Sequence, residues 1–538
     1  MDNFSVQKLA LANGQALDFG LNDIVLVVGR NSSGKSTFLR EIRSCVYDHA
    51  KSKKLIESAV FRGSTETDLR NRIYSTFRVI TDGLNHWVEG ERGNREFYLP
   101  SLMGGPSTLA LGGASKAFVS LLNAEGRLSL TKDVETIDLY KSKPRHPFHV
   151  FMVEPEKLNR TSDVVKQAFG LELRINRIGN PIRGYVAAHF EGQDTLSSEK
   201  SLPDEAELLI DQGDGLRSFA GIVGEVDAMS HPIVLIDEPE AFLHPPQAKR
   251  LARNIVQSLG DSRQAFIATH DSNFLQGAIG KMSSRMRVIR LERSHDSFNV
   301  IDIRHTDLKQ AEALPSLANT NLLDSLFYDQ TIICEGDADC KLFDHLIADE
   351  QRDRFWFSAS GKQQFHKVAQ LLSGFGVNWA AILDLDVLLD WELLAKLASL
   401  KNHDVSRHKK RIAGALRTML PPNLAGVRMA ATSALAKKVD DATAIRDALK
   451  ELDARKTSTP LKQYGLAAIP NGQERAHVEG LLNELSDVGI LLLRKGQLES
   501  YVPTVGLHGP AWVNSVLADT AKYASELNAL AAELEKVS

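Results

Sequence analysis

Residues 24–42 read IVLVV, then GRNSSGKS, then TFLREI. The first segment is apolar on both faces, which predicts a buried central strand, and the last has helical spacing. Backbone N–H groups of a glycine-rich loop and the N-terminus of the following helix attract phosphate oxygens. In this pattern Lys35 reaches the outer phosphates and Ser36 offers a hydroxyl to magnesium. The residues expected to bind the nucleotide here are Gly29, Asn31, Gly34, Lys35, Ser36 and Thr37.

Two later apolar segments end in residues that suit ATP hydrolysis. Residues 233–238 read IVLIDE, so a strand would end at Asp237, suited to magnesium, and Glu238, placed to polarise the attacking water. Residues 264–269 read QAFIAT and lead into His270, a position from which a side chain can sense the γ-phosphate. A lone histidine after a strand is more often structural, but the other motifs favour a role in the site.

A glycine-containing segment opens a third candidate element. The sequence GDGLRS, which contains Gly213, Gly215 and Ser218, precedes apolar residues at helical spacing. The N-terminus of such a helix is a further candidate anion-binding surface. Taken alone, the segment would be an ordinary helix cap.

Composition limits the class of protein. The 538 residues are 43% hydrophobic and 25% charged, with 64 Lys and Arg against 68 Asp and Glu and a net charge of -4. This length suggests about three or four domains of a globular chain. No apolar run approaches the roughly 20 residues that span a bilayer, and three cysteines give no disulfide framework. We expect a cytoplasmic protein without a membrane span, in which any nucleic-acid binding relies on a local basic surface.

The second half carries a different set of acidic residues. A predicted strand of residues 329–334 is followed by Glu335, and another of residues 379–383 is followed by Asp384 and Asp386. Residues i and i+2 of an extended segment project to one side, so the two aspartates can face one ion. Clustered carboxylates without His or Cys favour magnesium or manganese. The basic run 407–411 is a candidate phosphate-binding patch, although such runs are usually solvated faces.

The first set of motifs resembles ABC-type ATPases of the SMC and RecF kind. The matching segments are 29–37, 213–218, 237–240 with 243–245, and 269–270, which correspond to Walker A, signature, Walker B with D-loop, and switch histidine. In that family the signature helix of one protomer closes over the ATP held by the other. The resemblance therefore implies a homodimer or a higher even oligomer.

The second set resembles a TOPRIM domain, with Gly361-Lys362 as its glycine-lysine turn. The order of ATPase then TOPRIM is similar to the OLD (overcoming lysogenization defect) nucleases, which include the Gabija-type phage-defence nuclease. The resemblance implies two divalent ions held by Glu335, Asp339, Asp384, Asp386 and Glu499. It also makes Lys495 a candidate for stabilising transition-state charge.

Together these observations predict an α/β protein with an ABC-type P-loop ATPase core followed by a Rossmann-like TOPRIM domain with a helical insertion. We expect the ATPase at 1–327, with a lobe inserted at about 43–146, and the TOPRIM domain at 328–538, with its insertion at about 390–460. The expected function is ATP- and Mg²⁺-dependent cleavage of DNA, or of RNA, in anti-phage defence, with Mn²⁺ as an alternative ion and a defence-system protein or RNA as a further partner. The alternative is an ATP-dependent DNA-binding or sensor module whose TOPRIM domain scaffolds a partner without cutting. A topoisomerase or primase is disfavoured, because no strand-passage domain or zinc module is evident.

Overall fold

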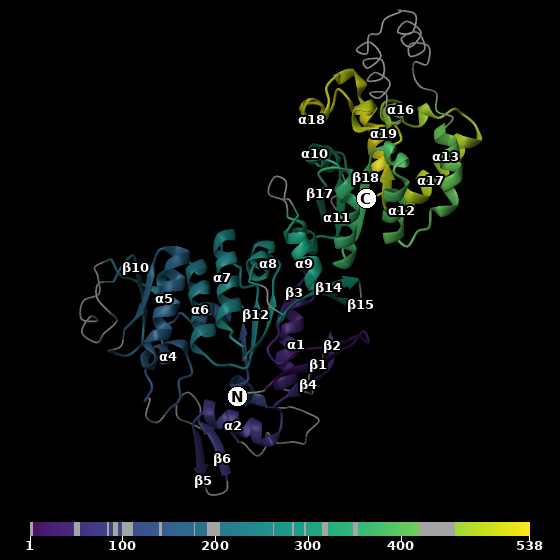
Figure 1. Ribbon diagram of the computed structural model, residues 1–538. Coiled ribbons are helices and arrows are strands. Elements are labelled where there is room, and N and C mark those ends of the chain that lie inside the picture. The colour runs from purple at the N-terminus through teal and green to yellow at the C-terminus, as the bar shows by residue number, and fades with distance from the viewer. Residues whose placement is uncertain are drawn as a thin grey trace, which may run out of the picture. The chain divides into compact units, whose positions relative to one another are not determined.

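The chain forms two compact units, Met1–Lys309 and Gln310–Ser538, in the computed structural model (Figure 1). The boundary that we expect at 327/328 stays a prediction. The structure describes residues 4–47, 54–82, 85–89, 95–98, 111–138, 142–176, 178–190, 205–261, 263–281, 284–294, 297–314, 321–347, 353–417, 419 and 458–537.

The first unit is built on a six-stranded sheet whose order is β15-β14-β3-β13-β12-β8. All neighbours from β14 to β8 pair in parallel, and β15 is antiparallel. The bounds are β3 (Ile24–Val28), β8 (Val119–Leu122), β12 (Ile233–Asp237), β13 (Gln264–Ala268), β14 (Met286–Ser294) and β15 (Ser297–Ile303). The apolar runs of β3, β12 and β13 form these strands because a parallel sheet covered by helices buries both of its faces.

Helices accompany this sheet. Helix α1 (Lys35–Tyr47) follows β3 and contacts β8, β12 and β13. Helices α6 (Asp214–Ala228), α7 (Pro245–Ser258) and α8 (Ser272–Ile279) lie side by side in that order (Figure 1). The remaining helices of this unit are α2 (Glu66–Thr76), α3 (Ala124–Ser129), α4 (Pro147–Val153) and α5 (Pro155–Phe169).

Three small antiparallel sheets complete the unit. They are β2-β1-β4 (Ala16–Asp18, Ser5–Leu11, Ile56–Arg62), β5-β6-β7 (Val79–Asp82, Asn85–Glu89, Arg95–Tyr98) and β11-β10-β9 (Glu207–Leu208, Gly184–Ala187, Glu172–Ile175). The segment 43–146, which we predicted as an inserted lobe, supplies β4 to the first of these sheets and β8 to the main sheet. These two strands therefore belong to the core, and residues 99–110 of the segment lie outside the described part.

The second unit has a four-stranded parallel sheet in the order β17-β16-β18-β19. Its strands are β16 (Gln330–Cys334), β17 (Arg354–Ser358), β18 (Trp379–Leu383) and β19 (Ile490–Leu492). Its helices are α10 (Asp337–Leu346), α11 (Lys362–Gly374), α12 (Trp391–Leu400), α13 (Lys409–Arg417), α16 (Ser458–Tyr464), α17 (Gln473–Asp487), α18 (Gly509–Ala518) and α19 (Ala524–Leu534), and α9 (His305–Glu312) spans the division. Within the predicted helical insertion, the described residues form α12, α13 and the start of α16, with an irregular segment at 401–405.

The predicted α/β class with parallel sheets is thus confirmed. Among the described residues, no helix combines the length and the apolar character needed to cross a membrane.

Close packing between α6 and α3 gives a test of this fold. A Cβ added at Gly221 of α6 would lie 2.4 Å from the carbonyl oxygen of Arg127 in α3. We expect Gly221→Ala to lower the free energy of unfolding by about 1–3 kcal/mol, because backbone has to move. Gly224→Ala in the same helix is the control, since its Cβ would meet a Phe151 ring carbon at an ordinary 3.6 Å. That change should be neutral or stabilising by up to about 1 kcal/mol. Calorimetry of both variants checks this, and equal effects would contradict it.

Candidate functional site

The loop between β3 and α1 has the shape that a phosphate-binding loop needs. Gly29 and Gly34 have φ angles of 141° and 102°, and Ser32 between them has a φ of 62°. A Cβ on Gly29 would lie 2.4 Å from the carbonyl oxygen of Leu291, so only glycine fits there. The loop therefore curls tightly and leads directly into the N-terminus of α1.

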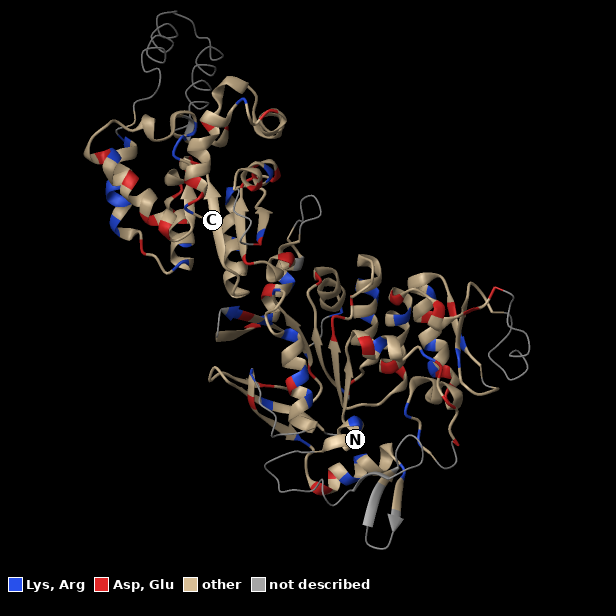
Figure 2. Ribbon diagram, turned by 180° about the vertical axis from the view of Figure 1, so that it is seen from behind, with Lys and Arg blue, Asp and Glu red and all other residues tan. Residues whose placement is uncertain are grey.

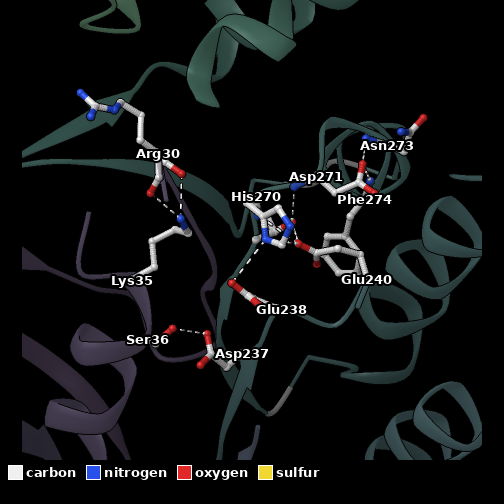
Figure 3. Close-up of polar contacts among 12 residues, drawn as sticks. Arg30, Lys35, Ser36, Asp237, Glu238, Glu240, His270, Asp271, Asn273 and Phe274 are labelled. Carbon is white, nitrogen blue, oxygen red and sulfur yellow. Dashed lines mark hydrogen bonds and ion pairs between the residues drawn. The ribbon is translucent and has the colours of Figure 1, made fainter. Parts of the chain in front are cut away.

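Lys35 begins α1 and points back over this loop (Figure 3). Its Nζ donates to the carbonyl oxygens of Gly29 and Arg30, both at 2.8 Å, and the residue is buried. Burial lowers the pKa of Lys35, while three nearby carboxylates act in the opposite direction. Hydrogen bonds to the two carbonyl oxygens thus hold the ammonium group at the loop. The phosphate oxygens of a nucleotide could take the place of these carbonyl oxygens as acceptors.

Ser36 and Asp237 form a pair across the sheet edge. The Ser36 hydroxyl donates to Oδ1 of Asp237 at 3.0 Å (Figure 3). Asp237 is the last residue of β12, in register with Ala268, the last residue of β13. Burial raises the pKa of Asp237, and a cation beside it would favour the charged form. A hydroxyl and a carboxylate held together are oxygen ligands of the kind that Mg²⁺ prefers, so these residues fit that ion.

His270 connects the two carboxylates that follow β12. Its Nδ1 lies 3.4 Å from Oε1 of Glu238 and 3.3 Å from Oε1 of Glu240 (Figure 3). Glu240 also accepts hydrogen bonds from the backbone N–H of His270 and the hydroxyl of Thr269, each at 2.9 Å. Glu238 has a positive φ of 49°, a backbone conformation that non-glycine residues adopt rarely. The candidate base and the candidate γ-phosphate sensor are therefore held in one network.

Arg127 is a residue that the sequence analysis missed. Its side chain is fully buried, and Nη1 donates to the carbonyl oxygens of Asp237 and, at 2.9 Å, of Glu238. Its Nε and Nη2 have no hydrogen-bond partner among the described residues. Burial lowers the pKa of Arg127, and the nearby carboxylates of Glu240, Asp237 and Glu238 act in the opposite direction. The guanidinium thus supports the backbone of Glu238, and no local motif around residue 127 marks this role.

The predicted signature segment lies at the start of α6, and its role toward a nucleotide stays a prediction. Gly213 caps α6, and a Cβ on Gly215 would lie 2.6 Å from the carbonyl oxygen of Phe242. Gly215 therefore permits close contact with the segment after Glu240 within the same chain. Ser218 is fully buried inside the unit, so the structure does not bring its side chain to a surface where a nucleotide could bind.

Carboxylates gather at the carboxyl ends of two adjacent strands in the second unit. Glu335 follows β16 and Asp384 follows β18, and these strands pair in parallel. Burial, and next the charge of Glu335, raises the pKa of Asp384 to about 7. Burial also raises the pKa of Asp339 to about 6, with added contributions from Glu335 and Glu499. These mutual effects indicate one cluster of negative charge.

Two lysines compensate this cluster. Lys362, which begins α11 after Gly361, forms ion pairs with Asp386 and, at 3.8 Å, with Glu335. The Nζ of Lys462, on α16, lies 3.5 Å from Oδ2 of Asp384 and 3.6 Å from Oδ2 of Asp386. No motif in the sequence links Lys462 to the strand ends, so its position could be found only in the structure.

Lys495, the candidate for stabilising transition-state charge, contacts an aromatic ring in the structure, and its catalytic role stays a prediction. Its Nζ lies 5.1 Å from the centre of the Tyr501 ring, a cation–π geometry. Within the described residues, the ion pairs to Asp384 and Asp386 come from Lys362 and Lys462. Glu499 accepts a hydrogen bond from the N–H of Gly509 at 2.8 Å, and Asp339 accepts one from Gly336 at 3.0 Å.

The carboxylate cluster fits a hard divalent cation in its chemistry. The donors are carboxylate oxygens, and the buried Oε1 of Glu335 has no hydrogen-bond partner among the described residues. However, no group of three or more His, Cys, Asp or Glu in the described ranges is arranged as a ready metal site. The lysines supply the positive charge in this conformation, so ion binding would require the carboxylates to shift.

Two family models match the chain. Residues 116–276 match AAA_21, described as "AAA domain, putative AbiEii toxin, Type IV TA system". Residues 326–386 match the OLD-like TOPRIM model, described as "Overcoming lysogenization defect protein-like, TOPRIM domain". The chain therefore joins an ATPase domain to a TOPRIM domain. This combination matches the OLD-family ATPase–TOPRIM organisation that the sequence motifs predicted, and it confirms that prediction.

Comparison with other proteins adds little beyond these domains. No curated protein matches the chain. One similar solved structure is a Smc head bound to the C-winged helix domain of ScpA, with 14% identity, coverage of 57% of this chain and 99% of that chain, and a TM-score of 0.36. Another is the SMC head domain from Thermotoga maritima, with 12% identity, coverage of 56% of this chain and 99% of that chain, and a TM-score of 0.31. A third is a Smc head domain with an extended coiled coil, bound to the C-terminal domain of ScpA, from Pyrococcus furiosus. It has 12% identity, coverage of 57% of this chain and 98% of that chain, and a TM-score of 0.32. These TM-scores are too low to support any argument about this chain.

Glu240 provides a pH test of the first site. Burial raises its pKa from 4.5 to about 7, so the folded protein holds a proton that the unfolded chain releases between these values. The free energy of unfolding should therefore fall as pH rises through this window, by on the order of 2–3 kcal/mol. Glu240→Gln should remove that part of the dependence, whereas Glu125→Gln, at an exposed position of α3, should not. Calorimetry at about pH 5 and about pH 7.5 checks this, and parallel profiles for all three proteins would contradict it.

Proposed function

We propose that this protein hydrolyses ATP in its first unit and uses its second unit as a divalent-metal-dependent nuclease. The observation that carries the proposal is the carboxylate cluster of Glu335, Asp384 and Asp386, compensated by Lys362 and Lys462 at parallel strand ends. The ATPase and OLD-like TOPRIM matches support this reading at the level of domains. A role in phage defence rests on the resemblance alone and stays a prediction.

In the first unit, each residue has a distinct task toward ATP. Lys35 would exchange its bonds to the loop carbonyls for phosphate oxygens, and Ser36 with Asp237 would hold Mg²⁺. Glu238 would take the proton of the attacking water, and His270 beside it would contact the γ-phosphate. The resemblance further implies that α6 of a second copy covers this ATP, so we propose a homodimer or a higher even oligomer.

In the second unit, the carboxylates would hold divalent ions against a nucleic-acid phosphate. The bound ions would supply Lewis acidity and an activated water for phosphodiester hydrolysis. Glu335, Asp384 and Asp386 would be the main ligands, and Asp339 and Glu499 would add negative charge. Lys362 and Lys462 would be released from the carboxylates and could then neutralise charge on the scissile phosphate. The proposed substrate is DNA, with RNA as the alternative.

The second candidate function is an ATP-dependent sensor whose TOPRIM domain scaffolds a partner without cutting. One observation favours it, because Lys362 and Lys462 already neutralise the carboxylates and no ready metal site is formed among the described residues. The two functions differ in whether added metal ions produce cleavage, which the nuclease experiment below measures.

Glu238 tests the ATPase part. Glu238→Gln should reduce the rate of ATP hydrolysis by on the order of 10²–10⁴-fold, because it removes the base and keeps the side-chain size. ATP affinity should stay close to the wild-type value, since Lys35 and the loop are intact. A phosphate-release assay and nucleotide binding by calorimetry measure the two quantities. Hydrolysis at the wild-type rate would show that Glu238 is not the base.

The nuclease part is tested on the carboxylates and on two lysines. Asp384→Asn should abolish cleavage of DNA in Mg²⁺ or Mn²⁺ and leave ATP binding unchanged, and EDTA should have the same effect on the wild type. Lys462→Met should lower the cleavage rate by on the order of tenfold or more, because it removes a charge beside the reacting phosphate.

Lys495→Met is the matched control, since Lys495 contacts Tyr501 and should leave cleavage nearly unchanged. Gel analysis of labelled DNA and RNA gives the rates. Cleavage that survives Asp384→Asn would place the chemistry elsewhere, and no metal-dependent cleavage of any DNA or RNA would favour the scaffold function.

A further inference from the structure

Helix α13 (Lys409–Arg417) carries a positive surface whose cations have no ion-pair partner among the described residues. Its sequence, KKRIAGALR, contains four cations and no acidic residue. Lys409, Lys410, Arg411 and Arg417 are all exposed, whereas Ile412 and Ala415 are buried. The buried side packs against α17, so the cations project from a fixed helix. In Figure 2, Lys and Arg are blue along this helix.

Some other helices pair a cation with an acidic residue of the same helix, although α7, with Lys249, Arg250 and Arg253, contains no acidic residue either. Arg70 of α2 pairs with Glu66, Lys396 of α12 pairs with Glu392, and Arg475 of α17 pairs with Glu479, each four residues away. Such pairs stabilise helices and neutralise charge. On α13, no ion pair to an acidic residue is found for the four cations within the described part of the chain. The neighbouring Arg407 does have one, with Glu484 at 2.7 Å.

The position of these cations also disfavours the helix itself. Lys409, Lys410 and Arg411 occupy the first turn, where the positive end of the helix dipole repels cations and acidic residues are favoured. The net charge of the whole chain is -4, so this positive surface differs from the nearly balanced charge of the rest of the chain. The stability of the helix therefore does not explain this cluster of cations, whereas binding of an anionic partner would explain it.

A groove adjoins the N-terminal turn of α13. It has a volume of about 900 Å³ and is lined by residues of α12 and of the segment leading to α13, with Lys409 at its edge. Its polar lining includes Lys396, Ser399, Asn402 and His403. Its two acidic residues, Glu392 and Asp404, balance the charges of Lys396 and Lys409, so the excess positive charge of this region lies on the outer side of α13.

We propose that α13 and this groove form a binding surface for the phosphate backbone of duplex DNA. The proposal deepens the nuclease function proposed above and rests on it for the identity of the ligand. Lys410 and Arg417 are seven residues apart on the outer side of the helix, about 10 Å along its axis. Duplex DNA carries one charge per about 1.7 Å of its axis with both strands counted, so this length of duplex contains roughly six phosphates. That charge density exceeds that of a single strand and suits four fixed cations.

The test is a charge reversal that spares both proposed catalytic sites. The variant Lys410→Glu with Arg411→Glu is compared with Lys522→Glu and Lys536→Glu, which makes the same change in net charge at exposed residues elsewhere in this unit. Fluorescence anisotropy with a labelled DNA duplex, in EDTA so that nothing is cut, gives the affinity between about 50 and 200 mM salt. We expect the α13 variant to bind on the order of 10- to 100-fold more weakly, with a salt slope reduced by about 2, and the control variant to match the wild type.

Cleavage in Mg²⁺ is measured separately, so that the two proposals can fail independently. If the wild type cuts duplex DNA but the α13 variant binds it with unchanged affinity and salt slope, the surface is wrong and the nuclease function stands. If binding weakens as expected but nothing is cut, the surface stands and the nuclease function fails. A wild type that does not bind duplex DNA, or that binds only single-stranded RNA through α13, overturns the surface as proposed here.

Discussion

Parallel pairing of strands in register is the constraint on which both sites depend. In the first unit, β3, β13 and β12 are neighbours, so the loop before Lys35, the histidine after β13 and the carboxylates after β12 all emerge at one sheet edge. In the second unit, β16 and β18 are neighbours in the same sense, which brings Glu335 and Asp384 together. Residues distant in the sequence meet because each follows the carboxyl end of a parallel strand.

Each site concentrates negative charge, and each is compensated by buried or half-buried cations. Beneath the first site, Arg127 donates to the backbone of Asp237 and Glu238, and Lys35 lies within the influence of the same carboxylates. In the second, Lys362 and Lys462 fill this role through direct ion pairs. Buried charges of one sign need such partners, because desolvation otherwise drives the carboxylates to take up protons.

Sequence patterns predicted the elements and the residues at their ends, because an apolar run followed by glycines or carboxylates is a local signal. They could not predict Arg127 or Lys462, since each reaches its site only through tertiary packing. The same limit applies to Ser218 and Lys495. Both belong to recognisable segments, yet helix orientation buries Ser218 within the unit, and the Tyr501 ring engages the ammonium of Lys495. Strand β8 was missed because its four residues, VSLL, are too short an apolar run to be told from other short apolar segments.

The position of Lys462 follows from the main chain around it. A Cβ on Gly496 would lie 2.3 Å from the carbonyl oxygen of Lys462, and the Ser500 hydroxyl donates to that same oxygen at 2.9 Å. The N–H of Leu385, between the two aspartates, donates to the carbonyl oxygen of Gly496 at 2.8 Å. One glycine thus joins α16 to the aspartate-bearing segment. The lysine that compensates these aspartates is therefore held by the loop that follows β19, and a movement of that loop would change the charge balance of the whole cluster.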